Sequence, residues 1–190
     1  GTSSSLVLTN SLSSPGDKVR CKATATDGYG GSADADSSVT VDNSDPTIQS
    51  ISITPNKDVT TSELLTCAVT ATDPDGGSPS ITYEWIDSAS TALGTGSTLQ
   101  LTNVNSSPGE TIKCVATATD AHGGSDWDSD NITVSNSAPY LTKVEITPDT
   151  GITTDTRLSC SGTAFDPDGG TPIITYEWTS EGSIVGTNTL

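Results

Sequence analysis

Two kinds of side chain in this sequence could do chemistry. Four are cysteines, Cys21, Cys67, Cys114 and Cys160, whose thiols can form disulfides or act as nucleophiles. The others are paired aspartates in the segment DPDGG, which occurs at 73–77 and again at 166–170. Two carboxylates at positions i and i+2 before a glycine turn can point into one concavity, as hard cations such as Ca²⁺ require.

Both sets recur because the chain repeats itself. A shift of 93 positions lays Cys21 on Cys114, Cys67 on Cys160, and ITYEW at 81–85 on ITYEW at 174–178. Such self-similarity indicates a tandem array. Residues 186–190 also occupy the repeat position at which the chain begins, so we expect a window slightly longer than two periods, cut from a longer array.

The period sets the expected domains, since 93 residues is close to the usual size of a single domain. Residues 46–138 are predicted to be a complete domain, 1–45 the second half of a preceding copy, and 139–190 the first half of a following one. The linkers NSDP and NSAP, which end at Pro46 and Pro139, are short. Proline restricts its own φ and the residue before it, so successive domains should stack end to end.

Apolar and polar residues alternate in short runs separated by Gly, Pro, Asn, Asp and Ser, a pattern that predicts antiparallel strands and no helix. In the complete unit the predicted strands are 48–54, 64–72, 80–86, 97–102, 111–119 and 131–135. The side chains expected to face inward are Leu65, Cys67, Val69 and Ala71, then Ile81, Tyr83 and Trp85, and finally Ile112, Cys114, Ala116 and Ala118.

Cys67, Trp85 and Cys114 fall on three of these strands in an arrangement that resembles the immunoglobulin-like (Ig-like) sandwich. The resemblance implies an all-β fold of tandem Ig-like sandwiches forming an end-to-end rod. It also implies a disulfide from Cys67 to Cys114 between the two sheets, with Trp85 packed against it. The segments 115–139 and 22–46 are similar to the tandem Ig-like repeats of bacterial and archaeal surface proteins, with PKD-like and cadherin-like repeats as neighbours.

The remaining cysteines lack their repeat partners. Cys21 and Cys160 either pair with cysteines beyond this sequence in a longer array, or Cys160 of one subunit pairs with Cys21 of the next in a head-to-tail polymer. Disulfide-bonded domains imply an oxidising compartment, so we expect an extracellular or cell-surface protein.

The aspartates have two interpretations. Asp-Pro-Asp-Gly-Gly is good turn chemistry by itself. Alternatively, the pole of an Ig-like sandwich nearest the preceding linker would gather carboxylates into a Ca²⁺ site. The first junction would collect Asp42, Asp45, Asp73, Asp75, Asp120, Asp126 and Asp128, and the second would have Asp166 and Asp168 but Ala138 in place of Asp45.

Charge and composition narrow the function. A net charge of −17 with seven basic residues argues against nucleic acid and anionic membranes as partners. The one histidine, His122, lies in a glycine-rich loop without a nucleophile motif, so no enzyme activity is expected. We expect a structural segment of a filament, sheath or surface protein that associates with copies of itself or adjacent repeats and does not insert into membranes. The alternative is an adhesive or carbohydrate-binding module that uses the loop near Trp127.

Overall fold

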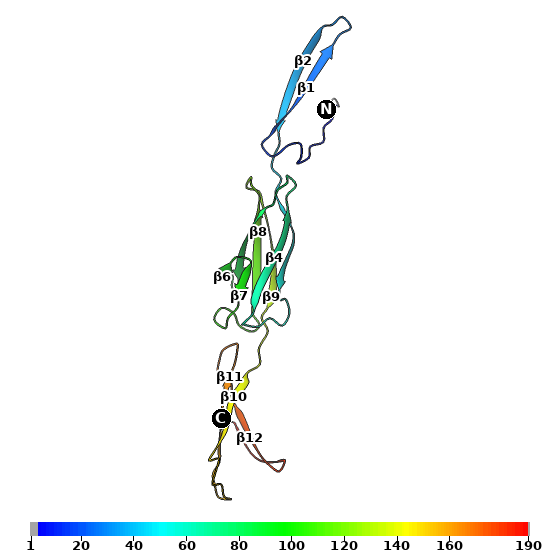
Figure 1. Ribbon diagram of the computed structural model, residues 1–190. Coiled ribbons are helices and arrows are strands. Elements are labelled where there is room, and N and C mark those ends of the chain that lie inside the picture. Colours follow the sequence, from blue (N-terminus) through cyan, green and yellow to red (C-terminus); the bar gives the residue numbers. More distant parts are fainter. Residues whose placement is uncertain (1–3, 190) are drawn as a thin grey trace.

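The computed structural model describes residues 4–189, in which strands and turns are present and helices are not (Figure 1). Within that range no helix has the length and apolarity needed to cross a membrane. In chain order the strands are β1 (Lys18–Thr26), β2 (Ser32–Thr40), β3 (Thr47–Thr54), β4 (Leu64–Thr72), β5 (Ser80–Ile86), β6 (Ala92–Thr95), β7 (Thr98–Gln100), β8 (Thr111–Thr119), β9 (Ser125–Thr133), β10 (Tyr140–Thr147), β11 (Ser159–Phe165), β12 (Thr175–Ser180) and β13 (Ser183–Thr189).

Residues 46–138, here called the central unit, contain two antiparallel sheets. One has the order β3-β4-β7 and the other the order β6-β5-β8-β9. The strands predicted at 64–72, 80–86 and 111–119 are confirmed with the same bounds. Their alternation explains the agreement, because in β8 every second side chain is buried.

The core of the central unit lies where the two sheets face each other. Cys67 on β4 forms a disulfide with Cys114 on β8, and the Cα atoms are 6.5 Å apart. Trp85 is fully buried opposite Cys114 in the β5–β8 pairing, and its Nε1 donates a hydrogen bond to the Gly96 carbonyl oxygen at 2.9 Å. This arrangement is consistent with a β-sandwich that is pinned between its sheets by one disulfide.

Two parts of the strand prediction were wrong. The last strand of the central unit, β9, starts at Ser125, whereas a strand over 131–135 was expected. The strand β6 was missed, and it is only four residues long with Gly94 within it. Both differences have a tertiary cause. Strand β9 is too polar, and β6 too short, to show an alternating pattern in the sequence, and each forms because it pairs with a neighbour, β9 with β8 and β6 with β5.

The parts on either side repeat portions of the central unit. Residues 4–45, the N-terminal segment, form the hairpin β1-β2; residues 139–189, the C-terminal segment, form the pairs β10-β11 and β12-β13. The three parts follow one another along an elongated molecule (Figure 1). Tertiary burial is concentrated in the central unit, where every buried apolar side chain of the described residues is found.

Candidate functional site

The two short junctions that connect these parts are the candidate site, because the DPDGG loops meet the linkers there. Each DPDGG loop forms a turn. The Asp73 carboxylate accepts a hydrogen bond from the backbone N–H of Asp75 at 2.8 Å, and Asp166 accepts one from Asp168 at 3.0 Å. Gly76 and Gly169 follow with φ of 91° and 90°, a conformation that favours glycine. The turn interpretation of this segment is therefore confirmed at both copies.

The second aspartate of each loop binds the preceding linker. Asp75 Oδ2 accepts a hydrogen bond from the backbone N–H of Ser44 at 2.6 Å, and Asp168 Oδ2 accepts one from Ser137 at 2.5 Å. Ser44 and Ser137 occupy the same position in the repeat. Each bond is charge-assisted and fixes the extended linker against the unit that follows it.

A second contact crosses each junction from the part that precedes it. The Asn10 side-chain nitrogen would lie 3.2 Å from a Cβ on Gly76, and the Asn103 nitrogen 3.5 Å from one on Gly169. Asn10 and Asn103 are also repeat equivalents. The same interface between a preceding part and a following loop is thus formed twice in one chain.

A loop of the central unit also contributes to the second junction. Thr61, in the loop between β3 and β4, is only 2% exposed, and its Oγ1 donates a hydrogen bond to Asp168 Oδ1 at 2.8 Å. Asp168 therefore joins the linker to the body of the central unit. The hydrogen bond from the Ser137 N–H is the main cause that holds the pKa of Asp168 below its usual value of 3.8; desolvation opposes it, and the Thr61 hydroxyl lowers the pKa by a smaller amount.

Asp120 performs a similar role at the first junction. Its Oδ2 accepts a hydrogen bond from Asn43 Nδ2 at 2.9 Å, and its Oδ1 accepts one from the backbone of Gly124 at 2.9 Å. The bond from Asn43 is the main cause of a lowered pKa at Asp120. Gly124 lies in close contact with the side chains of Asp45 and Asn43, because a Cβ at position 124 would come within 2.4 Å of Asp45 Oδ1 and 2.7 Å of Asn43 Nδ2.

The predicted metal ligands are only partly brought together. Asp45 and Asp120 approach each other over Gly124, and Asp42 is an exposed residue of the same linker. Asp73, Asp75, Asp166 and Asp168 accept the hydrogen bonds described above, which leaves them oriented toward protein N–H and hydroxyl groups. In the part of the chain that the structure describes, no three Asp, Glu, His or Cys side chains are placed to hold one metal ion. Calcium binding stays a prediction, which melting temperatures in Ca²⁺ and in EDTA would check.

Two aspartates expected at the first junction lie on a strand instead, which corrects the sequence analysis. Asp126 and Asp128 belong to β9, and Asp126 Oδ2 accepts a hydrogen bond from the backbone N–H of Ile48 at 2.8 Å. Asp130 makes the matching bond to Ile53 at 2.9 Å. Asp126 and Asp130 therefore bridge β9 to β3, an edge strand of the other sheet.

The cysteines divide as the repeat suggests. Cys67 and Cys114 form the disulfide, whereas Cys21 is a free, exposed thiol on β1 and Cys160 a free, half-buried thiol on β11. Which partners Cys21 and Cys160 take stays open at this point.

Sequence reasoning missed Asn10, Thr61 and Asn103 as junction residues. Recurrence was the available signal, since Asn10 recurs in the repeat as Asn103 and Thr61 as Thr154. Comparison with known proteins adds no family, because no protein-family model matches the chain and no curated protein matches it either.

Proposed function

We propose that the chain is a structural segment of a long extracellular filament, sheath or surface protein, built from disulfide-stapled Ig-like domains that follow one another as a rod. One observation carries this proposal: both junctions use the same contacts, from Asp75 to Ser44 and from Asp168 to Ser137. A flexible tether needs no repeated backbone clamp, whereas a rod that transmits force or sets spacing does.

Three further features support the proposal. The Cys67–Cys114 disulfide suits an oxidising compartment. The acidic surface, with a net charge of −17, favours solubility and repulsion between neighbouring rods. The linkers are short and proline-containing, which limits bending.

The junction clamp can be tested directly by measuring how rigidly the central unit and the C-terminal segment are coupled. Spin labels carried on unnatural amino acids in the β5–β6 and β12–β13 turns report their distance distribution by pulsed electron resonance. We expect one narrow distribution for the parent chain and a broad one for Asp168→Ala, which removes the bonds to Ser137 and Thr61.

Asp155→Ala is the matched control. It removes the same charge from the C-terminal segment, but Asp155 bonds only within its own loop, to Thr153. An Asp168→Ala distribution as narrow as that of Asp155→Ala would refute the clamp. Labelling of the source cells with antibodies against the chain tests the location, and a signal confined to the cell interior would refute an extracellular role.

One observation favours a second function, recognition of a glycan or a host surface. Trp127 on β9 is 68% exposed, and a solvent-facing indole can stack on a sugar ring. The same chain and its Trp127→Ala variant on a glycan array separate the two functions. Binding to one defined glycan that the variant loses would favour the adhesive role over a purely structural one.

A further inference from the structure

Strand β9 contains an acceptor sequence for N-linked glycans. Residues 131–133 read Asn-Ile-Thr, which has the form Asn-X-Ser/Thr with X other than proline. This pattern, the sequon, is the one that oligosaccharide transferases recognise in exported proteins. A second sequon, Asn-Ser-Ser, lies at 105–107 in the loop between β7 and β8. The sequence does not choose between the two, but the structure gives their asparagines very different surroundings.

Asn131 lies on the outer face of its sheet with a free side-chain amide. Its neighbour Ile132 is 5% exposed and packs in the core, so Asn131 and Thr133 point the other way, and both are exposed. Among the described residues, the hydrogen bonds of Asn131 come from its backbone, and its Nδ2 donates none. A glycan on this nitrogen would therefore displace no contact of the folded central unit.

Asn105 is in the opposite situation, because both ends of its side-chain amide hold the loop. Its Oδ1 accepts hydrogen bonds from the backbone N–H and the hydroxyl of Thr102 at 2.7 Å and 3.1 Å. Its Nδ2 donates a hydrogen bond to the Gln100 carbonyl oxygen at 3.1 Å, and the residue is half-buried. A sugar on this nitrogen would press against the Gln100 backbone and open the loop. Of the two asparagines, Asn131 is the one that the fold leaves available.

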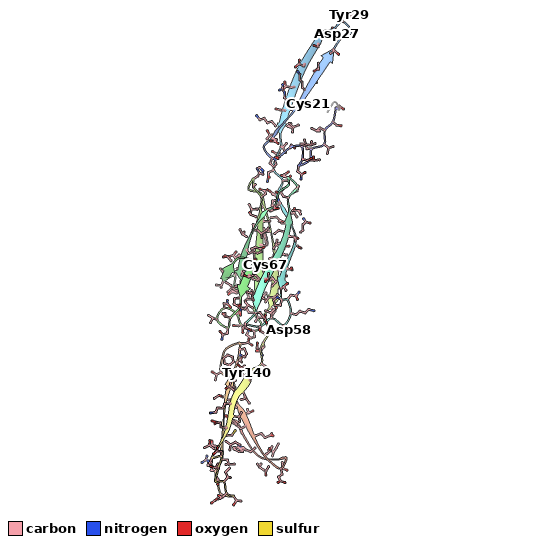
Figure 2. The ribbon with its side chains drawn as sticks, viewed as in Figure 1. Cys21, Asp27, Tyr29, Asp58, Cys67 and Tyr140 are labelled. Carbon is pink, nitrogen blue, oxygen red and sulfur yellow. A yellow bond between two sulfur atoms is a disulfide. The ribbon has the colours of Figure 1, made fainter. Side chains whose placement is uncertain are left out.

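The outer face of β9 is also open to solvent. Strand β9 is an edge strand of the sheet β6-β5-β8-β9 (Figure 1). The flanking parts lie beyond the two ends of the central unit, since Cys21 and Tyr140 are on opposite sides of Cys67 along the elongated molecule (Figure 2). An oligosaccharide attached to this face has room to extend along the strand.

The same face of β9 presents an exposed aromatic side chain. Trp127 is 68% exposed and precedes Asn131 by four residues, which places both on one side of the strand. At the usual rise of a strand, their Cα atoms are about 13 Å apart. The residue between them on this face is Ser129, which is small, and its partner on β8 is Val115. The path from the amide to the indole is therefore unobstructed, and a few sugar rings would span it.

Resting on the extracellular location proposed above, we propose that Asn131 is an N-glycosylation site and that the first sugars of its glycan lie against Trp127. A solvent-facing indole stacks on a sugar ring, and this contact removes apolar surface from water. Trp127 would then serve the chain's own glycan and not an external one. A bulky hydrophilic group at an edge strand also hinders edge-to-edge pairing, which suits rods that lie beside one another.

The covalent step is the transfer of an oligosaccharide from a lipid-linked diphosphate donor by a membrane-bound transferase. A bond forms between Asn131 Nδ2 and the anomeric carbon of the first sugar, while the bond from that carbon to the donor phosphate oxygen breaks. The lipid diphosphate leaves with the electron pair of the broken bond, and Nδ2 loses one proton. No group is oxidised or reduced.

The first test is glycopeptide mass spectrometry of the full chain, isolated from its source cells and also secreted by yeast. We expect a glycan on Asn131 and an unmodified Asn105 in both preparations. In the yeast material, Asn131→Gln and Thr133→Ala should each lose the glycan. Ser107→Ala is the matched control for Thr133→Ala, because it removes the hydroxyl of the other sequon, and it should keep the glycan.

The second test measures the contact with Trp127. Quenching of tryptophan fluorescence by acrylamide is compared before and after a peptide N-glycosidase removes the glycan. We expect less quenching while the glycan is present. Trp127→Phe should abolish that difference, because Trp85 is fully buried and Trp178 lies on β12, outside the central unit.

Different results would overturn different parts of the proposal. An unmodified Asn131 in the chain from source cells would reject the site, and a glycan on Asn105 would reject the selection between the two sequons. Equal quenching with and without the glycan would reject the contact with Trp127. An unmodified chain that antibodies detect at the cell surface would reject glycosylation and leave the structural role intact, whereas a chain confined to the cell interior would reject both.

Discussion

Removing the disulfide of the central unit should cost about 4 kcal/mol of unfolding free energy. The bridge joins residues 47 positions apart, and the chain-entropy model gives this value for a loop of that length. The core cannot easily absorb such a loss, since it relies on a small number of aliphatic side chains around Trp85. A domain of this size has only about 5–15 kcal/mol in total.

The measurements are urea unfolding and thermal unfolding of a Cys67→Ala/Cys114→Ala chain. Cys21→Ser and Cys160→Ser are included in both this chain and its reference, so that no free thiol can exchange. Trp127→Phe and Trp178→Phe leave Trp85 as the single tryptophan reporter. We expect the midpoint of thermal unfolding to fall by about 15–30 °C, the shift that 4 kcal/mol produces in a domain of this size.

The reference chain is the control. It also lacks two cysteines, Cys21 and Cys160, but these form no disulfide in the structure and their removal opens no loop. A loss below about 1 kcal/mol would refute the reasoning, since it would mean that the unfolded central unit is already as restricted as the bridged one. A changed dependence of free energy on urea concentration would place the effect in the unfolded state.

Three other predictions concern the core and the junctions. Gly124→Ala should broaden the distance distribution across the first junction, because its Cβ would displace the junction side chains above it, whereas Gly28→Ala meets nothing within 4 Å and should have no effect. Trp85→Phe should cost about 1–3 kcal/mol in urea unfolding through the lost volume and the lost Nε1 hydrogen bond, compared with less than about 0.5 kcal/mol for the exposed Trp127→Phe. Because the pKa of Asp168 is lowered in the folded state, its contribution should be complete above pH 3.8 and lost as the pH falls through the lowered value, which distance measurements in acid should show and Asp168→Ala should abolish.

Much of the central unit could be predicted because its strands bury one face. Strict alternation in 111–119 fixed both the bounds of β8 and the inward direction of Cys114. The segment 125–130 gave the opposite signal, since three aspartates within it indicate a loop. It is a strand because β8 supplies its hydrogen bonds and because Asp126 and Asp130 find backbone donors on β3.

The junctions were predicted in composition but not in geometry. The sequence placed aspartates near the linkers and left open whether they turn the chain or bind a cation. In the structure, Asp75 and Asp168 accept hydrogen bonds from linker N–H groups, a choice that depends on where the linker backbone runs. No local pattern in the sequence encodes that path.

The sequence alone determined the repeat and the strand faces, because these follow from periodicity, and its resemblance to the Ig-like sandwich implied the Cys67–Cys114 pairing that the structure contains. Only the tertiary structure decided which hydrogen bonds the aspartates accept and which side chains are left exposed. Alternation states which face of a strand is apolar, but exposure depends on whether the opposing sheet is present. Ile53 and Ile146 occupy the same position in the repeat, and one is buried while the other is not.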